Sequence, residues 1–206
     1  MALVRLAEWL KRLVWLAAIS LLLAACAGRD PYVSASVNAA TAGNWRIERQ
    51  LDRITGAPIS SAFLVTRSVS NSAILFPKPA ELQLMCFKQQ PAVRVAFTFK
   101  VGSTKNAELG YRFDDRPGHE PPVRFVEDYK TIVIEDKAAV TQFVDELATA
   151  NALYVRIRSF DAGRSSAEFH VDGAPAAIAA GFAACPFTPA TRASAQTPAA
   201  RITGKR

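Results

Sequence analysis

Hydrophobic and polar residues alternate along most of the chain with a period of two, which is the pattern of half-buried β-strands. The clearest run extends from residue 91 to residue 101, with Val93, Val95 and Phe97 on one side and Arg94 and Thr98 on the other. The same alternation predicts strands over residues 45–51, 61–69, 82–86, 109–113, 123–126, 131–134, 153–160 and 167–171. Turn-forming residues separate these segments, so we expect short antiparallel strands.

The period changes to that of an α-helix at two places in the second half of the chain. The first has apolar residues at i, i+3, i+4 and i+7, namely Val140, Phe143, Val144 and Leu147. Asp136 is suited to cap the start of this helix, and Asn151 to end it. The second begins at Pro175, because proline is favoured in the first turn of a helix. Its inner side carries Ile178, Phe182 and Cys185.

About eight strands and two short helices predict a mainly β domain of the α+β class over residues 44–186. We expect an antiparallel β-sandwich or a strongly bent sheet, with one helix covering an open face or end. The alternative is a single sheet with both helices packed on one face.

The first 25 residues have the organisation of a secretory signal peptide. Arg5, Lys11 and Arg12 precede an apolar run from residue 13 to residue 23, and small residues then lead to Cys26. The run is shorter than the roughly 20 apolar residues that a membrane-spanning helix needs. Leu23-Ala24-Ala25-Cys26 resembles the lipobox of bacterial lipoproteins, which implies that Cys26 becomes the first mature residue and carries the lipid.

Two other readings of this segment stay open. Ala25-Cys26-Ala27 also fits the A-x-A site of a signal peptidase that releases a soluble periplasmic protein, and an uncleaved segment would act as a signal anchor. Ala27 is not acidic, which in the lipoproteins that the segment resembles favours sorting to the outer membrane. We therefore expect an outer-membrane lipoprotein that faces the periplasm and is held to the membrane by its N-terminal lipid.

The segments on either side of the domain have few large apolar residues. Residues 26–43 are small and polar, which predicts a flexible tether. Residues 187–206 mix Ala, Thr, Pro and Arg, which predicts a disordered basic tail.

The distribution of charge argues against a nucleic-acid partner. The formal net charge is +7, but the tail contributes four basic residues and no acidic one, and the signal segment has three basic residues against one acidic. Residues 44–186 are close to neutral and have no basic stripe of the kind that follows a phosphate backbone.

Cysteine usage predicts one disulfide. If Cys26 carries the lipid, Cys86 and Cys185 remain as an even pair in an oxidising compartment. The alternative is a pair of buried free thiols.

No catalytic or metal-binding set stands out in the sequence. His119 lies in a Gly/Pro/Glu turn and His170 alternates outward, so both read as surface histidines. The acidic pairs 114–115 and 127–128 adjoin turns, where such residues are common, and a calcium site at Asp114, Asp115 and Glu120 lacks the ligand spacing of a known loop. We therefore predict a protein that is not an enzyme and has no cofactor or metal.

A candidate interaction surface follows from the outward positions of the best strands. It consists of arginine, tyrosine and aspartate side chains, namely Arg112, Asp114, Tyr154, Arg156 and Arg158. Aromatic and arginine side chains on a rigid sheet are typical of a protein contact. The other interpretation is an ordinary solvated sheet face with cross-strand charge pairs.

The order of these landmarks over residues 45–186 resembles the VasI-like periplasmic proteins associated with type VI secretion. The landmarks are Trp45, Leu84-Met85-Cys86, Tyr111-Arg112-Phe113-Asp114, Leu153-Tyr154-Val155-Arg156, Phe169-His170-Val171-Asp172-Gly173 and Cys185-Pro186. The resemblance implies a non-enzymatic accessory protein of the envelope. Pro186 departs from the pattern, because an aromatic residue often follows the last cysteine in the family.

Three functional hypotheses follow. The first is a lipid-anchored, disulfide-stabilised envelope protein that binds another protein or the cell wall. The second is an exported hydrolase or hydrolase inhibitor that acts on cell-wall glycan through the acidic turn at Asp114. The third is a structural lipoprotein that bridges membrane and wall.

Overall fold

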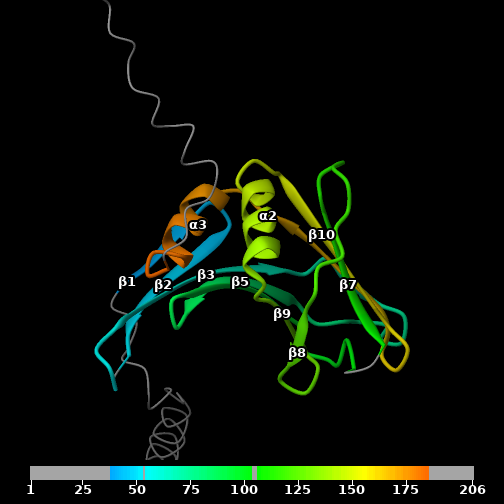
Figure 1. Cartoon of the computed structure of the whole chain (residues 1–206). Helices are drawn as coiled ribbons and strands as arrows, with labels where there is room; N and C mark the ends of the chain where they lie inside the picture. Colours follow the sequence, from blue (N-terminus) through cyan, green and yellow to red (C-terminus); the bar gives the residue numbers. More distant parts are fainter. Residues whose placement is uncertain (1–37, 53, 104–105, 186–206) are drawn as a thin grey trace, which may run out of the picture.

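The described strands form two open antiparallel sheets (Figure 1). The computed structural model describes residues 38–52, 54–103 and 106–185. The large sheet has the order β1 (Asn38–Ala42), β2 (Trp45–Leu51), β3 (Pro58–Thr66), β5 (Ala80–Phe87), β6 (Gln90–Ala96), β9 (Thr131–Ile134) and β8 (Arg124–Val126). The small sheet has the order β4 (Val69–Asn71), β11 (Gly163–His170), β10 (Ala152–Ser159) and β7 (Ala107–Phe113). The predicted mainly β class is confirmed.

The two sheets meet where the chain passes from β3 to β4. The hydroxyl of Thr66 donates to the carbonyl of Glu168 at 2.5 Å, and the amide of Glu168 donates to the carbonyl of Ser68 at 2.9 Å. This corner turns the chain out of the large sheet and into the small one. The strands therefore do not form the single sheet that was the alternative prediction.

Two helices, α2 (Lys137–Leu147) and α3 (Ala174–Gly181), pack on the same side of the large sheet (Figure 1). α3 packs on β2, β3 and β5, and α2 packs on β6 and beside α3. The ring of Phe143 on α2 meets the rings of Tyr111 and Phe113 on β7 edge-on, with centroids 4.9 and 5.0 Å away. α2 therefore links the two sheets through one continuous core.

The predicted start of α2 is confirmed at Asp136. Its carboxylate accepts from the amide of Ala139 at 2.9 Å, which satisfies one of the free N–H groups of the first turn. The predicted stop at Asn151 is wrong, because the helix ends at Leu147 and Ala148 is its C-cap. Pro175 lies in the first turn of α3, as predicted.

The N-terminal boundary of the domain differs from the prediction. Residues 38–42, assigned to the tether 26–43, form β1 and pair with β2, from Asn38 opposite Arg49 to Ala42 opposite Trp45. The turn that follows is tightly packed, because an added Cβ on Gly43 would lie 2.3 Å from the carbonyl oxygen of Asp172. The strand was missed because small residues show no apolar alternation. The signal peptide 1–25, Cys26, the rest of the tether and the tail 187–206 lie outside the described residues.

The predicted disulfide between Cys86 and Cys185 is confirmed. The Cα atoms of the two cysteines are 5.6 Å apart. The bond joins the end of β5 to the chain just beyond α3, so it fixes α3 against the large sheet at the point where the described chain ends.

Three strand predictions also need correction in their extent. The strand expected over residues 167–171 occupies residues 163–170. The strand expected over residues 61–69 occupies residues 58–66, and Ser70 and Asn71, which lie beyond the expected strand, belong to β4. Their side chains bond to Ser166 and Ser165 across the sheet at 2.7 and 2.9 Å. The strand expected to reach residue 101 ends at Ala96, although Phe97 and Val101 still face the core.

Candidate interaction surface

Several arginine side chains lie on the solvent-facing side of the small sheet, which we call the arginine face. It consists of Arg112, Tyr154, Arg156, Arg158 and Arg164, with Glu108 and Glu120 among them. The alternation of buried and exposed residues places these side chains outward, because Leu109, Tyr111 and Phe113 of β7 and Leu153, Val155 and Ile157 of β10 fill the core.

The register of the strands sets the order of the arginine face. Across the β7–β10 pair, Arg112 lies opposite Tyr154, Gly110 opposite Arg156, and Glu108 opposite Arg158. Across the β10–β11 pair, Arg158 lies opposite Arg164. Four of the five predicted residues of this surface therefore lie together on one sheet face.

Two carboxylates hold the central arginines. Glu120 lies 3.1 Å from Arg156 and 3.4 Å from Arg158, and Glu108 lies 2.9 Å from Arg158. Within the described residues, Arg112 makes no ion pair. A guanidinium of this kind is available to bind a carboxylate through two parallel N–H bonds.

Gly110 makes room for the guanidinium of Arg156. An added Cβ at position 110 would lie 3.2 Å from Nη2 of Arg156, closer than most side-chain contacts. The arginine therefore lies across the backbone of β7 instead of projecting straight into solvent. This arrangement leaves a hollow of about 560 Å³, lined by Gly110, Arg112, Gly118, Glu120, Tyr154 and Arg156 together with Tyr111 and His119.

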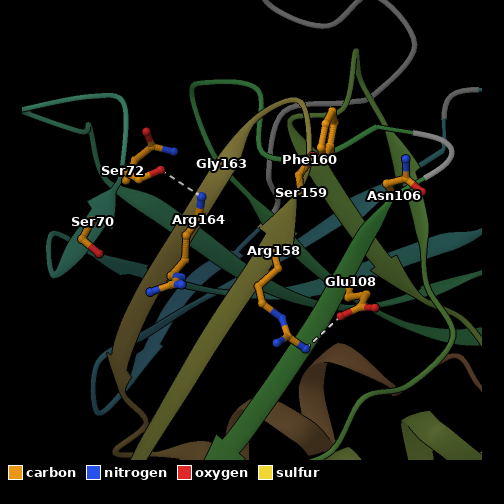
Figure 2. Close-up of a pocket in the computed structure, with 10 residues that line it drawn as sticks. Ser70, Ser72, Asn106, Glu108, Arg158, Ser159, Phe160, Gly163 and Arg164 are labelled. Atoms are coloured by element: carbon orange, nitrogen blue, oxygen red, sulfur yellow. Dashed lines mark hydrogen bonds and ion pairs between the residues drawn. The ribbon is translucent and has the colours of Figure 1, made fainter.

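Two further hollows continue this one along the strands. One of about 510 Å³ lies beyond Arg112 and Tyr154, toward Asp115 and Glu168. Another of about 770 Å³ lies toward the β10–β11 turn and is drawn in Figure 2. In this view Arg158 points toward Glu108, Arg164 extends over the neighbouring strand, and Phe160 stands at the rim. Phe160 is 87% exposed.

Asp114, the fifth predicted residue, has a different place from the other four. β7 ends at Phe113, and Asp114 adopts a φ of 46°, which turns its side chain out of the strand alternation. Its carboxylate accepts from the amides of Asn151 at 3.1 Å and Ala152 at 2.9 Å. Asp114 borders the hollow beyond Arg112, but its carboxylate serves to join the end of β7 to the start of β10.

The loop between β7 and β8 forms one wall of the arginine face, and it is fixed to α2. His119 Nε2 lies 2.7 Å from Glu146 Oε1, and His119 Nδ1 lies 3.1 Å from the side-chain nitrogen Nε2 of Gln142. Arg116 donates to the carbonyl of Glu146 at 3.0 Å. The reading of His119 as a surface histidine is wrong, since its side chain is only 20% exposed. His170 is exposed, as predicted.

Tyr111 lies below this loop with its hydroxyl in the core. The residue is 2% exposed, and its oxygen has no hydrogen-bond partner among the described residues. Burial, and secondarily the negative charge of Glu146, raise the pKa of Tyr111 well above its usual range. The phenol is therefore neutral at any physiological pH and contributes packing to α2 and β7.

Sequence reasoning missed Glu108, Gly110, Glu120 and the His119–Glu146 pair. Glu108 and Gly110 alternate with the buried Leu109 and Tyr111, so the period of β7 was a usable signal for them. Glu120 and His119 lie in an irregular loop, and the sequence holds no signal for their tertiary partners.

The described residues contain no group of three metal-ligating side chains that could hold an ion. Within the same residues, no helix has the length and apolar character needed to cross a bilayer. A scan against protein-family models, a search of curated proteins and a search of solved structures found no match to this chain.

Proposed function

We propose that this chain is a lipid-anchored accessory protein of the cell envelope that acts without catalysis by binding a partner protein on its arginine face. The observation that carries the proposal is the arginine face itself. Arg112 makes no ion pair within the described residues, and Arg156 lies beside it, across Gly110. Tyr154 lines both the 560 Å³ hollow next to Arg156 and the 510 Å³ hollow beyond Arg112. Arginine and tyrosine are the residues most enriched at the centres of protein interfaces.

The chemistry of the surface favours a partner with exposed carboxylates. A carboxylate placed between Arg112 and Arg156 would receive N–H donors from two guanidinium groups, and the ring of Tyr154 offers 41% of its surface for packing beside them. The strands beneath are fully hydrogen-bonded at these positions, so the side chains are presented with little loss of backbone entropy on binding.

The location of the protein is proposed from its first 26 residues. The charged start, the apolar run and the small residues before Cys26 support export and a lipid at this cysteine. The disulfide between Cys86 and Cys185 is consistent with an oxidising compartment. The resemblance to VasI-like periplasmic proteins supports the same compartment.

A hydrolytic function through Asp114 has less support. A general acid or base must exchange protons with its substrate, whereas the carboxylate of Asp114 accepts from the backbone amides of Asn151 and Ala152. The geometry therefore favours a structural use of this residue.

In-cell photocrosslinking tests the proposal. A photoreactive residue replaces Arg112, Tyr154 or Arg156 in separate strains, and Val65, which is 52% exposed on the large sheet, serves as the control position. We expect the three positions on the arginine face to crosslink to the same protein and Val65 to give no such product. Arg112→Glu, combined with crosslinking from Tyr154, should reduce the yield at least tenfold, because a guanidinium–carboxylate contact becomes a repulsion.

Three results would contradict the proposal. They are equal crosslinking from Val65, no effect of Arg112→Glu, and products that contain peptidoglycan but no protein. The last result would favour a structural lipoprotein that bridges membrane and wall.

A further inference from the structure

The first and last described residues lie at the same end of the large sheet, which also has exposed apolar side chains. We call this end the exit end. Asn38, the first described residue, lies opposite Arg49 of β2, two residues before the strand ends. Cys185, the last described residue, is bonded to Cys86 at the end of β5. Since β3 hydrogen-bonds to both β2 and β5, these strand ends are neighbours. The two ends of the described chain therefore lie at the same end of the large sheet, at the left of Figure 1.

Two hairpin turns present large apolar residues at the exit end. Ile54, in the β2–β3 turn, is 77% exposed, and Phe87, at the start of the β5–β6 turn, is 60% exposed. The turns are close together, because Leu51 pairs with Pro58 and Ser61 pairs with Met85 along the intervening strand.

Local bonds hold both side chains in their exposed positions. The carboxylate of Asp52 accepts from the amide of Ile54 at 2.9 Å and from the hydroxyl of Thr55 at 2.7 Å. The ammonium of Lys88 lies 5.5 Å from the ring centroid of Phe87. The side chains of Ile54 and Phe87 are therefore part of the two turns, and they face solvent within the described structure.

The charges around these two side chains are mostly positive. Among the described residues of the β2–β3 and β5–β6 turns and the strand ends beside them, Arg49 and Lys88 are exposed and Asp52 is half-buried. Apolar side chains with basic residues around them bind to anionic lipid surfaces by inserting the first and pairing the second with lipid phosphates.

We propose that the exit end rests on an anionic lipid bilayer, with Ile54 and Phe87 inserted at the headgroup level and Arg49 and Lys88 against lipid phosphates. This proposal rests on the envelope location proposed above. The 12 residues that follow Cys26, from Ala27 to Asn38, reach at most about 40 Å when extended. An anchored chain therefore keeps the exit end close to the membrane at a high effective concentration, and weak contacts suffice to orient it.

Leu75, Phe76 and Phe160 serve as control positions, because they lie toward the opposite end of β5. Leu75 and Phe76 are each 90% exposed and precede Ala80, where β5 begins, whereas Phe87 ends that strand. Phe160 is 87% exposed and lies on the same far side, since Ser72 bonds to the backbone of Arg164 near the Phe160 turn. A membrane contact at the exit end thus leaves Phe160 and the adjoining part of the arginine face away from the bilayer.

Tryptophan depth measurements on the full chain test this orientation. Ile54→Trp and Phe87→Trp report on the exit end, and Phe76→Trp and Phe160→Trp report on the far end. Each variant is reconstituted into vesicles of phosphatidylethanolamine and phosphatidylglycerol, and the emission of the unsubstituted chain is subtracted. We expect lipids with brominated acyl chains to quench the tryptophans at positions 54 and 87 at least threefold more than those at 76 and 160.

Charge variants make the test more specific. Arg49→Glu together with Lys88→Glu should reduce the quenching at position 87 at least twofold, as should vesicles of phosphatidylcholine alone, while circular dichroism shows an unchanged fold. Equal quenching at all four positions, or quenching only at 76 and 160, would overturn the proposal. A blue shift at position 87 that depends on protein concentration without vesicles would also overturn it, in favour of a second copy of the chain. Crosslinking from the arginine face does not depend on the quenching result. Failure of the membrane contact can therefore be distinguished from failure of the proposed partner binding.

Discussion

Glu81 is a carboxylate whose surroundings favour its neutral form. It lies on β5 opposite Ala96, and burial, partly offset by Arg46 and Arg94, raises its pKa above the usual value of 4.5. A group with a raised folded-state pKa binds its proton more tightly in the folded protein. Stability is therefore lost as the pH rises from the unfolded-state pKa through the folded-state pKa.

The first prediction concerns Glu81→Gln, which removes this titration and keeps the shape of the side chain. We expect the variant to be slightly more stable than the natural chain at pH 7, and the advantage to disappear below about pH 4, where both side chains are neutral. Urea midpoints measured across this pH range check it. Glu135→Gln serves as a control with the opposite sign, because the hydrogen bond from Arg124 lowers the pKa of Glu135. This variant should be less stable than the natural chain at pH 7, and the difference in stability should disappear as the pH falls.

The second prediction concerns Gly173, which lies between β11 and α3 with a φ of 87°. An added Cβ would lie 2.1 Å from the carbonyl oxygen of Ala42, the last residue of β1. Gly173→Ala should therefore lower the free energy of unfolding by more than about 2 kcal/mol, since it combines a strained φ with a backbone collision. Gly56→Ala separates the two causes, because Gly56 has a φ of 69° and nothing within 4 Å. Its cost in chemical denaturation should be about 1 kcal/mol, and equal costs would contradict the collision.

Individual residues were predictable from the sequence where their role is local. The cap at Asp136 depends on residues within one helical turn, and the Cys86–Cys185 pair could be inferred because it was the only pairing left. Asp114 was not predictable, since its partners at Asn151 and Ala152 are distant in sequence and the positive φ that directs it is a tertiary outcome.

At the scale of elements, the disulfide links the end of β5 to the chain after α3. It closes a separation of 99 residues. α3 is short and carries small residues, so its attachment depends on the large sheet and on this bond.

The third prediction is that reduction loosens α3 before it affects the small sheet. Cys86→Ala together with Cys185→Ala should lower the free energy of unfolding by about 2–5 kcal/mol, because a long loop regains entropy in the unfolded chain. Hydrogen exchange followed by mass spectrometry should show that exchange accelerates more in α3 than in β10, where it changes only by the loss of global stability. Faster exchange in β10 alone would contradict the assignment of the bond to α3.

Strands with a strong apolar alternation were predictable as elements, and those without it were not. β7 and β10 each have a full set of alternating core residues, and both were identified. β1 consists of small residues and β4 has three residues, so neither contains enough pattern to indicate a strand. Both form because a neighbouring strand offers hydrogen bonds to their backbones.

At the scale of the whole molecule, the two sheets share one core. Leu84 and Val93 from the large sheet and Val155 and Ile157 from the small one belong to the same buried cluster, and Phe143 of α2 lies against β7. The class was predictable from the number of strands and helices. Two sheets were expected in the β-sandwich arrangement. The assignment of strands to each sheet was not predictable, because it depends on the corner at Thr66 and Ser68, whose polar residues form bonds that no periodicity reveals.

The last prediction follows from this shared core. The small sheet and the large sheet with its two helices contribute side chains to one buried cluster, so the loss of either sheet exposes the apolar face of the other, and both should open in a single transition. Amides of β5 and β10 should therefore exchange with the same opening free energy in native-state hydrogen exchange. Phe143→Ala should lower that energy by about 3–5 kcal/mol in both sheets together, since it removes a ring that links them. A decrease confined to β7 and β10 would mean that the small sheet unfolds on its own, and the arginine face would then be less rigid than the proposed binding requires.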